Sequence, residues 1–231
     1  MLEAIGLTKK YRNHTALNNL NLKVGSGEVF CLLGQNGAGK TTTINLFLGF
    51  TTASSGQARV NGLVVNHQNG ETKQFLAYIP EVVMLYAHLS SIENLDFFSR
   101  IAGYTYKINE LEEFLLQAGL QPDAFHKRVG HYSKGMRQKV GIAIAVAKNA
   151  SVILMDEPTS GLDPKATDEF SEIVKQLSKD GRSIFMATHD IFNAVNVGTR
   201  IGIMRQGSLI HTLDAKDISA VDLQRLYLET I

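Results

Sequence analysis

Residues 34–41 are Gly34-Gln35-Asn36-Gly37-Ala38-Gly39-Lys40-Thr41. They follow the apolar run Val29–Leu33 and open a helical pattern, and they match the phosphate-binding pattern G-x-x-x-x-G-K-[ST] at every defined position. The glycines let backbone N–H groups turn inward around an anion, and the helix N-terminus adds a partial positive charge. We therefore expect a nucleoside triphosphate here, with Lys40 on its β- and γ-phosphates, Thr41 on Mg²⁺ and Thr42 beside them. A chance glycine-rich turn after a strand is the alternative.

Two adjacent carboxylates, Asp156 and Glu157, follow a second apolar run, Val152–Met155. A strand that ends there delivers Asp156 to the C-terminal edge of the sheet, where the phosphate loop also lies. We expect Asp156 to hold Mg²⁺ through a ligand water and Glu157 to polarise the attacking water as general base. If the strand stays extended, these two adjacent side chains point opposite ways, so one acid can face the metal and the other the water. A solvated acidic turn is the alternative for this segment alone.

Short apolar segments alternate with longer helical patterns along the 231 residues. The strand candidates are Val29–Leu33, Val152–Met155, Ser183–Ala187 and Ile201–Met204. The helix candidates are Lys40–Leu48, Ile92–Ile101, Glu110–Gln117, Ser133–Lys148, Ala166–Ser178 and Ile191–Val195. The first three strand candidates are nearly all apolar, as expected of a parallel sheet covered on both faces. This alternation predicts an α/β fold with a mainly parallel sheet.

Two regions depart from this alternation. Residues 1–28 and about 55–66 carry hairpin signals, with Gly25-Ser26-Gly27 and Asn61-Gly62 as turns, and they predict a small antiparallel β subdomain beside the core. Residues from about 90 to 148 are almost wholly helical, with Ser90 or Ser91 as N-cap, and predict a helical insertion. The length fits a single domain over residues 1–231, with this helical subdomain inserted in its core.

Composition narrows the class of protein. The formal net charge of +1 provides no whole-molecule field that would attract DNA or RNA, so we expect no nucleic-acid partner. The only cysteine, Cys31, lies in an apolar strand candidate; it excludes an internal disulfide and is interpreted as a buried strand residue rather than a reactive thiol. No apolar run approaches the roughly 18 residues of a membrane span. The first residues show no signal-peptide pattern, so a soluble, cytoplasmic chain is expected.

Further motifs follow one another in a recognisable order. They are Tyr11, Tyr78-Ile79-Pro80-Glu81, Tyr132-Ser133-Lys134-Gly135-Met136-Arg137-Gln138, Ser160-Gly161-Leu162-Asp163 and Ala187-Thr188-His189-Asp190. Together with the phosphate loop and Asp156-Glu157, they resemble the nucleotide-binding subunit of an ATP-binding cassette (ABC) transporter, in order along nearly the whole chain. The resemblance implies a P-loop NTPase (RecA-like) core, ATP and Mg²⁺ as cofactors, and an ATPase whose hydrolysis of ATP is coupled to transport across a membrane.

The resemblance also implies roles for single residues in one chain. Tyr11 lies where such subunits carry an aromatic ring that stacks on adenine. Glu81 lies where the family's glutamine loop meets Mg²⁺ and water. His189 is similar to the family's switch histidine, which hydrogen-bonds the γ-phosphate and, together with Glu157, promotes hydrolysis.

A second group of residues is implied to act across a dimer. Ser133 is expected to be an N-cap, so Ser133, Lys134, Gly135 and Met136 open a helix whose free N–H groups can meet an anion. In the resembled family this helix end, the signature, meets the γ-phosphate bound by a second subunit. Asp163 is implied to act at the same seam and to couple the two sites. The partner is implied to be a second copy of this chain or a related ATP-binding subunit, with two Mg-ATP held between them.

Three residues depart from the family's usual pattern. Glu81 replaces the commoner glutamine, which adds negative charge near the phosphates while keeping an oxygen ligand for Mg²⁺. Lys134 stands where many relatives have glycine, and its charge can support the γ-phosphate or lie aside against solvent. Met136 replaces the signature's glutamine, and Gln138 lies two residues later. Glu81 and the segment from Tyr132 to Gln138 resemble subunits that serve exporters of the ABC-2 type.

The resemblance implies transmembrane permease subunits as further partners, which would place this chain on the inner face of the cell membrane. The apolar segment Val82-Val83-Met84-Leu85-Tyr86 suits a contact with such a permease, or else burial within the helical insertion. The alternatives are a cassette of DNA repair, ribosome control, iron–sulfur assembly or cell division, a nucleotide-gated scaffold, and a small-molecule kinase. The remaining histidines show no metal-like spacing and are expected in surface or loop positions: His14, His67, His88, His126, His131 and His211.

Overall fold

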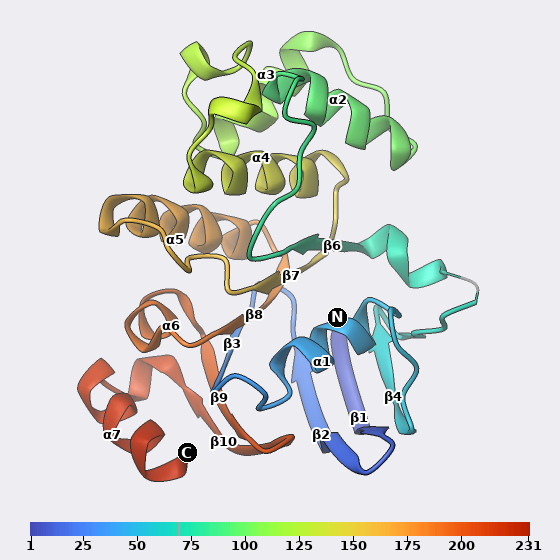
Figure 1. Ribbon diagram of the computed structural model, residues 1–231, viewed down its shortest axis with the longest axis vertical. Helices are drawn as coiled ribbons and strands as arrows, with labels where there is room; N and C mark the ends of the chain where they lie inside the picture. Colours follow the sequence, from blue (N-terminus) through green and yellow to red (C-terminus); the bar gives the residue numbers. More distant parts are fainter. Residues whose placement is uncertain (69) are drawn as a thin grey trace.

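The core of the protein is a six-stranded sheet, seen in Figure 1 in a computed structural model that describes residues 1–68 and 70–231. Its strands are β3 (Val29–Gly34), β6 (Leu76–Ile79), β7 (Val152–Asp156), β8 (Ser183–Thr188), β9 (Arg200–Arg205) and β10 (Ser208–Asp214). They lie in the order β10-β9-β3-β8-β7-β6. All neighbours are parallel except β9 and β10, which are antiparallel. The predicted α/β fold with a mainly parallel sheet is confirmed.

Apolar residues cover both faces of this sheet, because its central strands alternate between two hydrophobic cores. In β3, Val29, Cys31 and Leu33 pack on the side of most helices, whereas Phe30 and Leu32 pack toward the antiparallel sheet. The period of two follows from the pleat of a strand. Cys31 is completely buried, as expected from the sequence.

Helices surround the sheet (Figure 1). They are α1 (Lys40–Phe47), α5 (Pro164–Lys179), α6 (Ile191–Val197) and α7 (Ala220–Thr230), with a short 3₁₀ turn η4 (Ala215–Asp217) before the last. The first three agree with the sequence-based prediction to within two residues at each end. Helix α7 was not predicted, although Ser219 caps it by accepting a hydrogen bond from the Asp222 N–H.

A smaller antiparallel sheet lies beside the core. It contains β1 (Leu2–Tyr11), β2 (His14–Val24), β4 (Ser55–Val60) and β5 (Leu63–Val64) in the order β2-β1-β4-β5. The prediction of this sheet is confirmed, and Asn61-Gly62 forms the turn between β4 and β5. The turn of the β1–β2 hairpin is Arg12-Asn13, however, whereas Gly25-Ser26-Gly27 carries the chain from one sheet to the other.

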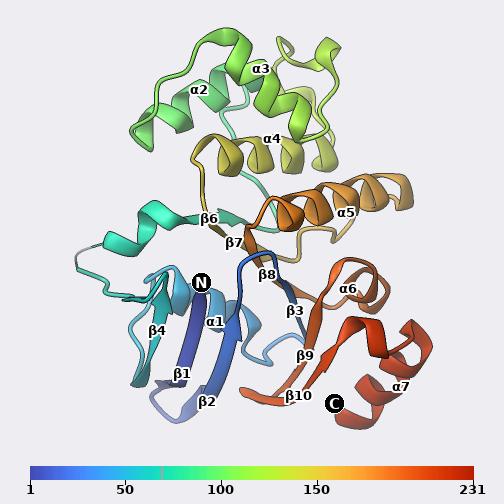
Figure 2. The ribbon, with the colours of Figure 1, turned by 180° about the vertical axis from the view of Figure 1, so that it is seen from behind.

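The helices between β6 and β7 stand together at one end of the molecule, away from the antiparallel sheet, in both Figure 1 and Figure 2. They are α2 (Ser91–Ile101), α3 (Ile108–Gln117) and α4 (Lys134–Ala147), with the 3₁₀ turns η2 (Pro122–Ala124) and η3 (Val129–His131) between α3 and α4, whereas a further 3₁₀ turn, η1 (Glu71–Phe75), precedes β6. Ser90 caps α2 in a capping box with Glu93. Among the described residues, the structure contains no helix long and apolar enough to cross a membrane.

Candidate functional site

The phosphate loop joins β3 to α1 and lines a cavity of about 520 Å³. Gly39 is the N-cap of α1 at φ +110°, and a Cβ atom there would lie 2.6 Å from the Ala16 carbonyl oxygen. Only glycine therefore fits this position. The N–H groups of the first turn of α1 have no acceptor within the helix, and the positive end of the helix dipole lies there too. This wall of the cavity is suited to an anion.

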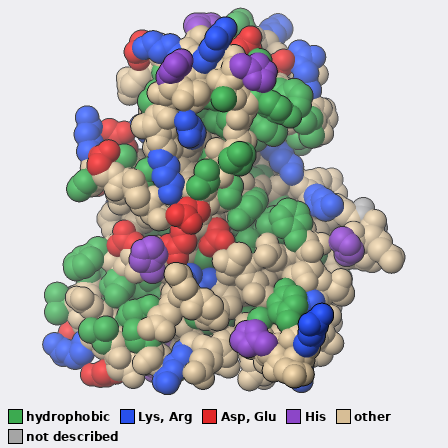
Figure 3. All heavy atoms as spheres, in the orientation of Figure 1, with side chains coloured by type: hydrophobic (Ala, Val, Ile, Leu, Met, Phe, Trp, Pro, Cys, Tyr) green, Lys and Arg blue, Asp and Glu red, His purple; other side chains and the backbone are tan. Residues whose placement is uncertain are grey.

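Most residues predicted to contact nucleotide or metal line this one cavity: Tyr11, Gln35, Asn36, Gly37, Gly39, Lys40, Thr41, Thr42, Glu81, Asp156 and Glu157. Gly34 lies just outside the lining and contributes its carbonyl oxygen to Lys40. Ala38, also in the loop, is buried. On the face seen in Figure 3, acidic side chains gather near the middle with a histidine beside them.

Lys40 is almost completely buried, with 6% of its surface exposed. Its Nζ donates to the carbonyl oxygens of Gly34 at 2.6 Å and Gln35 at 3.4 Å. The same atom lies 3.4 Å from Glu157 Oε1. That carboxylate oxygen is buried without a hydrogen bond to any residue that the structure describes. The lysine charge is thus balanced by Glu157 within the phosphate-binding part of the cavity.

The two adjacent carboxylates do not point opposite ways, in contrast to the expectation for an extended strand. Strand β7 ends at Asp156, and Glu157 has a left-handed backbone with φ +46°. The Glu157 N–H donates to the Ala187 carbonyl oxygen at 2.8 Å. This turn brings both carboxylates into the lining of the same cavity.

Asp156 is a buried carboxylate, 9% exposed. Burial raises its pKa above the ordinary value, and the charge of Glu157 adds to the rise, while the neighbouring Thr41 hydroxyl opposes it. Oxygen atoms of Thr41 and Asp156 therefore lie together at the edge of the sheet. Both are hard oxygen donors of the kind that Mg²⁺ prefers.

His189 follows β8 and contacts Glu157 rather than the cavity wall. Its Nδ1 lies 2.8 Å from Glu157 Oε2, and its backbone N–H donates to the same oxygen at 3.2 Å. The ring itself is largely exposed. Glu157 is thereby held between a lysine on one side and a histidine on the other.

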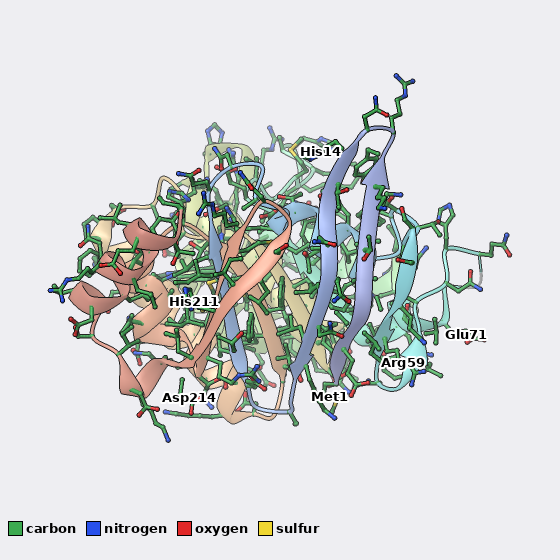
Figure 4. The ribbon with its side chains drawn as sticks, turned by 90° about the horizontal axis from the view of Figure 1, so that it is seen from below. Met1, His14, Arg59, Glu71, His211 and Asp214 are labelled. Atoms are coloured by element: carbon green, nitrogen blue, oxygen red, sulfur yellow. The ribbon has the colours of Figure 1, made fainter. Side chains whose placement is uncertain are left out.

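His14, expected in a surface or loop position, is exposed and also lines the cavity. It lines the cavity with Tyr11 and Ala16, and Figure 4 shows it at the opposite end of the hairpin from Met1. Tyr11 and His14 are partners in the strand register, so a two-residue turn at Arg12-Asn13 would have predicted that they face each other. Lys9 Nζ lies 4.8 Å from the centre of the Tyr11 ring.

Glu81 lines the cavity, and its side chain also contacts the first residue of α4. Its Oε1 accepts a hydrogen bond from the Ser160 hydroxyl at 3.0 Å and lies 3.5 Å from Lys134 Nζ. Gln138, one turn further along α4 and fully buried, donates to the carbonyl oxygens of Pro80 and Glu81 at 3.2 and 3.1 Å. Lys134 therefore neither lies aside against solvent nor contacts the cavity of its own chain.

The residues implied to act across a dimer lie outside the cavity lining of this chain: Ser133, Lys134, Gly135, Met136 and Asp163. Ser133 is the N-cap of α4 as expected, and its hydroxyl accepts from the Met136 N–H at 3.2 Å. Asp163 caps α5 by accepting from the Ala166 N–H at 2.9 Å. The structure thus separates the predicted site residues into a lined cavity and a second group at the beginning of two helices.

The segment after Glu81 is half exposed. Val82, Met84 and Tyr86 are exposed, whereas Val83 and Leu85 pack against the core of the helices. Val83 and Leu85 thus agree with burial within the helical insertion, and the contact of the exposed residues with a permease stays a prediction. Nearby, an apolar groove of about 360 Å³ runs between β6, α2 and α4 and includes Phe50, Tyr78 and Ile101.

Comparison with known proteins gives consistent results. A family profile described as ABC transporter matches residues 17–160. The bacitracin transport ATP-binding protein BcrA of Bacillus licheniformis is 34% identical over 214 residues, which cover 92% of this chain and 69% of that protein. The linearmycin resistance ATP-binding protein LnrL of Bacillus subtilis is 34% identical over 212 residues, which cover 91% of this chain and 68% of that protein.

Solved structures with the same arrangement are also ATP-binding proteins. An ATP-binding subunit of an ABC transporter has a TM-score of 0.83 and 28% identity and covers 99% of each chain. A dimeric post-hydrolysis state of the ATP-binding cassette MJ0796, bound to ADP and Pi, has a TM-score of 0.82 and 26% identity over 93% of this chain and 99% of that one.

Proposed function

This chain belongs to the ABC transporter family as an ATP-binding subunit that hydrolyses ATP, and from this premise we propose how its residues divide the work. The observation that supports the proposal is the separation of the site into two parts. The cavity of one chain has a phosphate loop, two carboxylates and an aromatic ring, while Ser133 and its helix lie outside that lining. Each chain therefore holds half of a site, and two chains close around two ATP molecules.

Within one chain, the cavity binds ATP along its length. The base stacks on Tyr11, whose ring is exposed toward the cavity, and the phosphates lie on the N–H groups of residues 37–42. His14 lines the same end as Tyr11 and contacts the base or the ribose. Lys40 leaves Glu157 and the two carbonyl oxygens to reach the β- and γ-phosphates. Its near-complete burial means that the lysine is held inside the site before nucleotide arrives.

Three oxygen-donating side chains, of which Asp156 ends β7, fit a magnesium ion. Thr41 and Asp156 present oxygen atoms side by side. Burial disfavours the ionised form of Asp156 when no cation is near, so a bound cation would stabilise the ionised carboxylate. Glu81 lies on the same cavity and supplies a further carboxylate oxygen. When bound, Mg²⁺ neutralises charge on the β- and γ-phosphate oxygens. Three oxygen-donating side chains of this chain would hold it.

Hydrolysis depends on Glu157, which we assign as the general base. Its buried Oε1 has no hydrogen-bond partner among the described residues, so it is free to accept one from the attacking water. His189 holds the other carboxylate oxygen at 2.8 Å and thereby fixes the direction of the carboxylate. Once Lys40 has turned to the phosphates, the Glu157 carboxylate is no longer paired with the lysine and can take the proton of the attacking water.

The second half of each site comes from the partner chain. Ser133, Lys134, Gly135 and Met136 open α4, whose first N–H groups meet the γ-phosphate held by the other chain. Asp163, at the start of α5, lies next to the same seam. The charge of the γ-phosphate holds the two chains together, and its release after hydrolysis lets them separate. Nucleotide state thus shifts an equilibrium between open and closed dimers.

The groove between β6, α2 and α4 is where we place the permease. It is mostly apolar, and its lining includes exposed Phe50 and Ile101 together with Lys73 and Lys148. The segment beyond Glu81 adds exposed Val82 and Met84 beside α4. A short amphipathic helix of the permease with acidic ends would fit this chemistry. This docking places the chain on the inner face of the membrane and makes Glu81 the link between nucleotide and permease.

We further propose that transport is directed outward. The support is the likeness to BcrA, named for bacitracin transport, and to LnrL, named for linearmycin resistance, together with the glutamate at position 81. The cargo pathway belongs to the permease. Export would be tested by reconstituting this chain with that permease in vesicles and measuring the movement of labelled bacitracin or linearmycin.

Closure around ATP is tested with the purified chain. The Glu157→Gln variant should form dimers in the presence of Mg-ATP and not of Mg-ADP, as measured by light scattering after size exclusion. Ser133→Arg in the same protein should bind ATP and stay a single chain, because a bulky cation replaces the cap of α4. Dimers that form equally well with ADP, or that survive Ser133→Arg, would contradict the proposed closure.

A further inference from the structure

The side chains of Glu81 and Lys134 form an ion pair that bridges two functional segments of one chain. Glu81 lies on the ATP cavity, and Lys134 is the first residue of α4. Their Oε1 and Nζ atoms are 3.5 Å apart, and the Ser160 hydroxyl donates to the same Oε1 at 3.0 Å. Both side chains are partly exposed, 52% and 31% respectively, so the pair can open without unfolding its surroundings.

Lys134 occupies an electrostatically unfavourable position in its helix. A cation in the first turn faces the positive end of the helix dipole, and α4 has no acidic residue in that turn to offset it. Lys134 therefore requires an anion from outside the helix. In one chain that anion is Glu81, and in the proposed closed dimer the γ-phosphate of the other chain would lie at the same helix end.

The backbone beside Glu81 is held independently of this pair. Gln138 lies four residues after Lys134, on the same face of α4, and its buried amide donates to the carbonyl oxygens of Pro80 and Glu81. Loss of the ion pair therefore releases the carboxylate of Glu81 while its backbone stays attached to α4. The electrostatic effect of Glu81 reaches Asp156, whose pKa it helps to raise.

We propose that Lys134 exchanges partners during closure, leaving Glu81 of its own chain for the γ-phosphate held by the partner chain. The inference rests on the proposed dimer and adds a link between its two sites. ATP in the partner's site competes for Lys134, and the Glu81 thereby released belongs to the other site, where it faces Asp156. Lys134 is thus a positioning residue for Glu81. Through this pair, each chain couples its own ATP site to the ATP site of its partner.

A double-mutant cycle tests the exchange. In Glu157→Gln protein, the ATP concentration for half-maximal dimerisation is measured for the parent, Glu81→Gln, Lys134→Gln and the double variant. Removing Glu81 abolishes the competing ion pair only where Lys134 is present. Partly exposed pairs contribute about 0.2–1 kcal/mol, so Glu81→Gln should lower the half-maximal concentration about 1.4- to 5-fold more with Lys134 than with Gln at position 134. The extra factor should disappear near 1 M salt, where screening extends to about 3 Å.

Lys127→Gln is the matched control, because Lys127 forms an exposed ion pair with Asp123 and pairs with neither Glu81 nor Lys134; it should leave every midpoint unchanged. Equal effects of Glu81→Gln in both backgrounds, or an extra factor that persists at high salt, would overturn the exchange while leaving closure intact. Absence of ATP-driven dimers in all four proteins would instead refute the proposed function, and the exchange with it.

Discussion

Replacing Glu157 by glutamine should separate ATP binding from ATP hydrolysis. Glu157 Oε1 lies 3.4 Å from Lys40 Nζ, and ATP must displace this contact before Lys40 can reach its phosphates. The variant removes the competing charge and also one negative charge beside the γ-phosphate. Both changes favour ATP binding, whereas the loss of the general base slows hydrolysis.

The separation of 3.4 Å sets the size of the effect on affinity. Coulomb's law for unit charges at this distance gives about 1.2 kcal/mol with the screening of bulk water and about 5 kcal/mol at an effective dielectric constant of 20. Both side chains are mostly buried, so the first value is a lower bound. It corresponds to about eightfold tighter ATP binding. Loss of a general base should lower kcat about 10²- to 10⁴-fold.

Both quantities can be measured without interference from dimerisation. Equilibrium ATP binding is compared between Ser133→Arg and Ser133→Arg/Glu157→Gln, which keep the chains apart, and phosphate release is measured for Glu157→Gln in the otherwise native chain. Glu169→Gln is the control, because Glu169 pairs with Lys139 at 2.6 Å outside the cavity lining. Affinity that is unchanged or weaker, or turnover within tenfold of the parent, would refute this account of Glu157.

Three further predictions concern stability, pH and thiol chemistry. Phe185→Ala should lower the free energy of unfolding by about 3–5 kcal/mol in denaturant titrations, because this fully buried ring packs against Phe30 and Phe47 at centroid distances of 6.0 and 5.9 Å; a loss below about 1 kcal/mol would contradict the packing. Asp156→Asn should make the nucleotide-free protein more stable near pH 7, because burial raises the pKa of Asp156 and its ionised form destabilises the fold; the gain should vanish as the pH falls below the ordinary carboxyl value of about 4, and a gain confined to acid would reverse the assignment. Burial raises the pKa of Cys31 to about 12, so a thiol reagent at pH 8 should react with the denatured chain and not with the native one.

The parallel sheet could be predicted because its central strands carry their own signal. β3, β7 and β8 are short apolar runs that end at the sheet edge where the phosphate loop and the two carboxylates lie. β6 (Leu76–Ile79) gives no such signal, since four residues ending before Pro80 become a strand only by pairing with Val152–Met155 far along the chain. Helix α7 has a cap and buried Leu223 and Tyr227 one turn apart, so an amphipathic pattern was present there.

In the site, spacing predicts the residues but not the contacts between them. The turn at Glu157, with φ +46°, depends on a hydrogen bond to Ala187 from another strand, and an extended strand was the only local expectation. The pairing of Glu81 with Lys134 joins segments 53 positions apart, which no local pattern encodes. His14 is different, because the two-residue hairpin turn that places it opposite Tyr11 is visible in the sequence.

The claim that two chains complete each ATP site can be measured by mixing two defective proteins. In the Glu157→Gln background, one protein carries Lys40→Ala and cannot bind phosphate, and the other carries Ser133→Arg and cannot clamp it. A mixed dimer has one site with both defects and one site with neither. Light scattering should therefore show single chains for each protein alone with Mg-ATP and a species of two chains for the mixture. A mixture that remains at the mass of one chain, or either protein dimerising alone, would contradict the shared site.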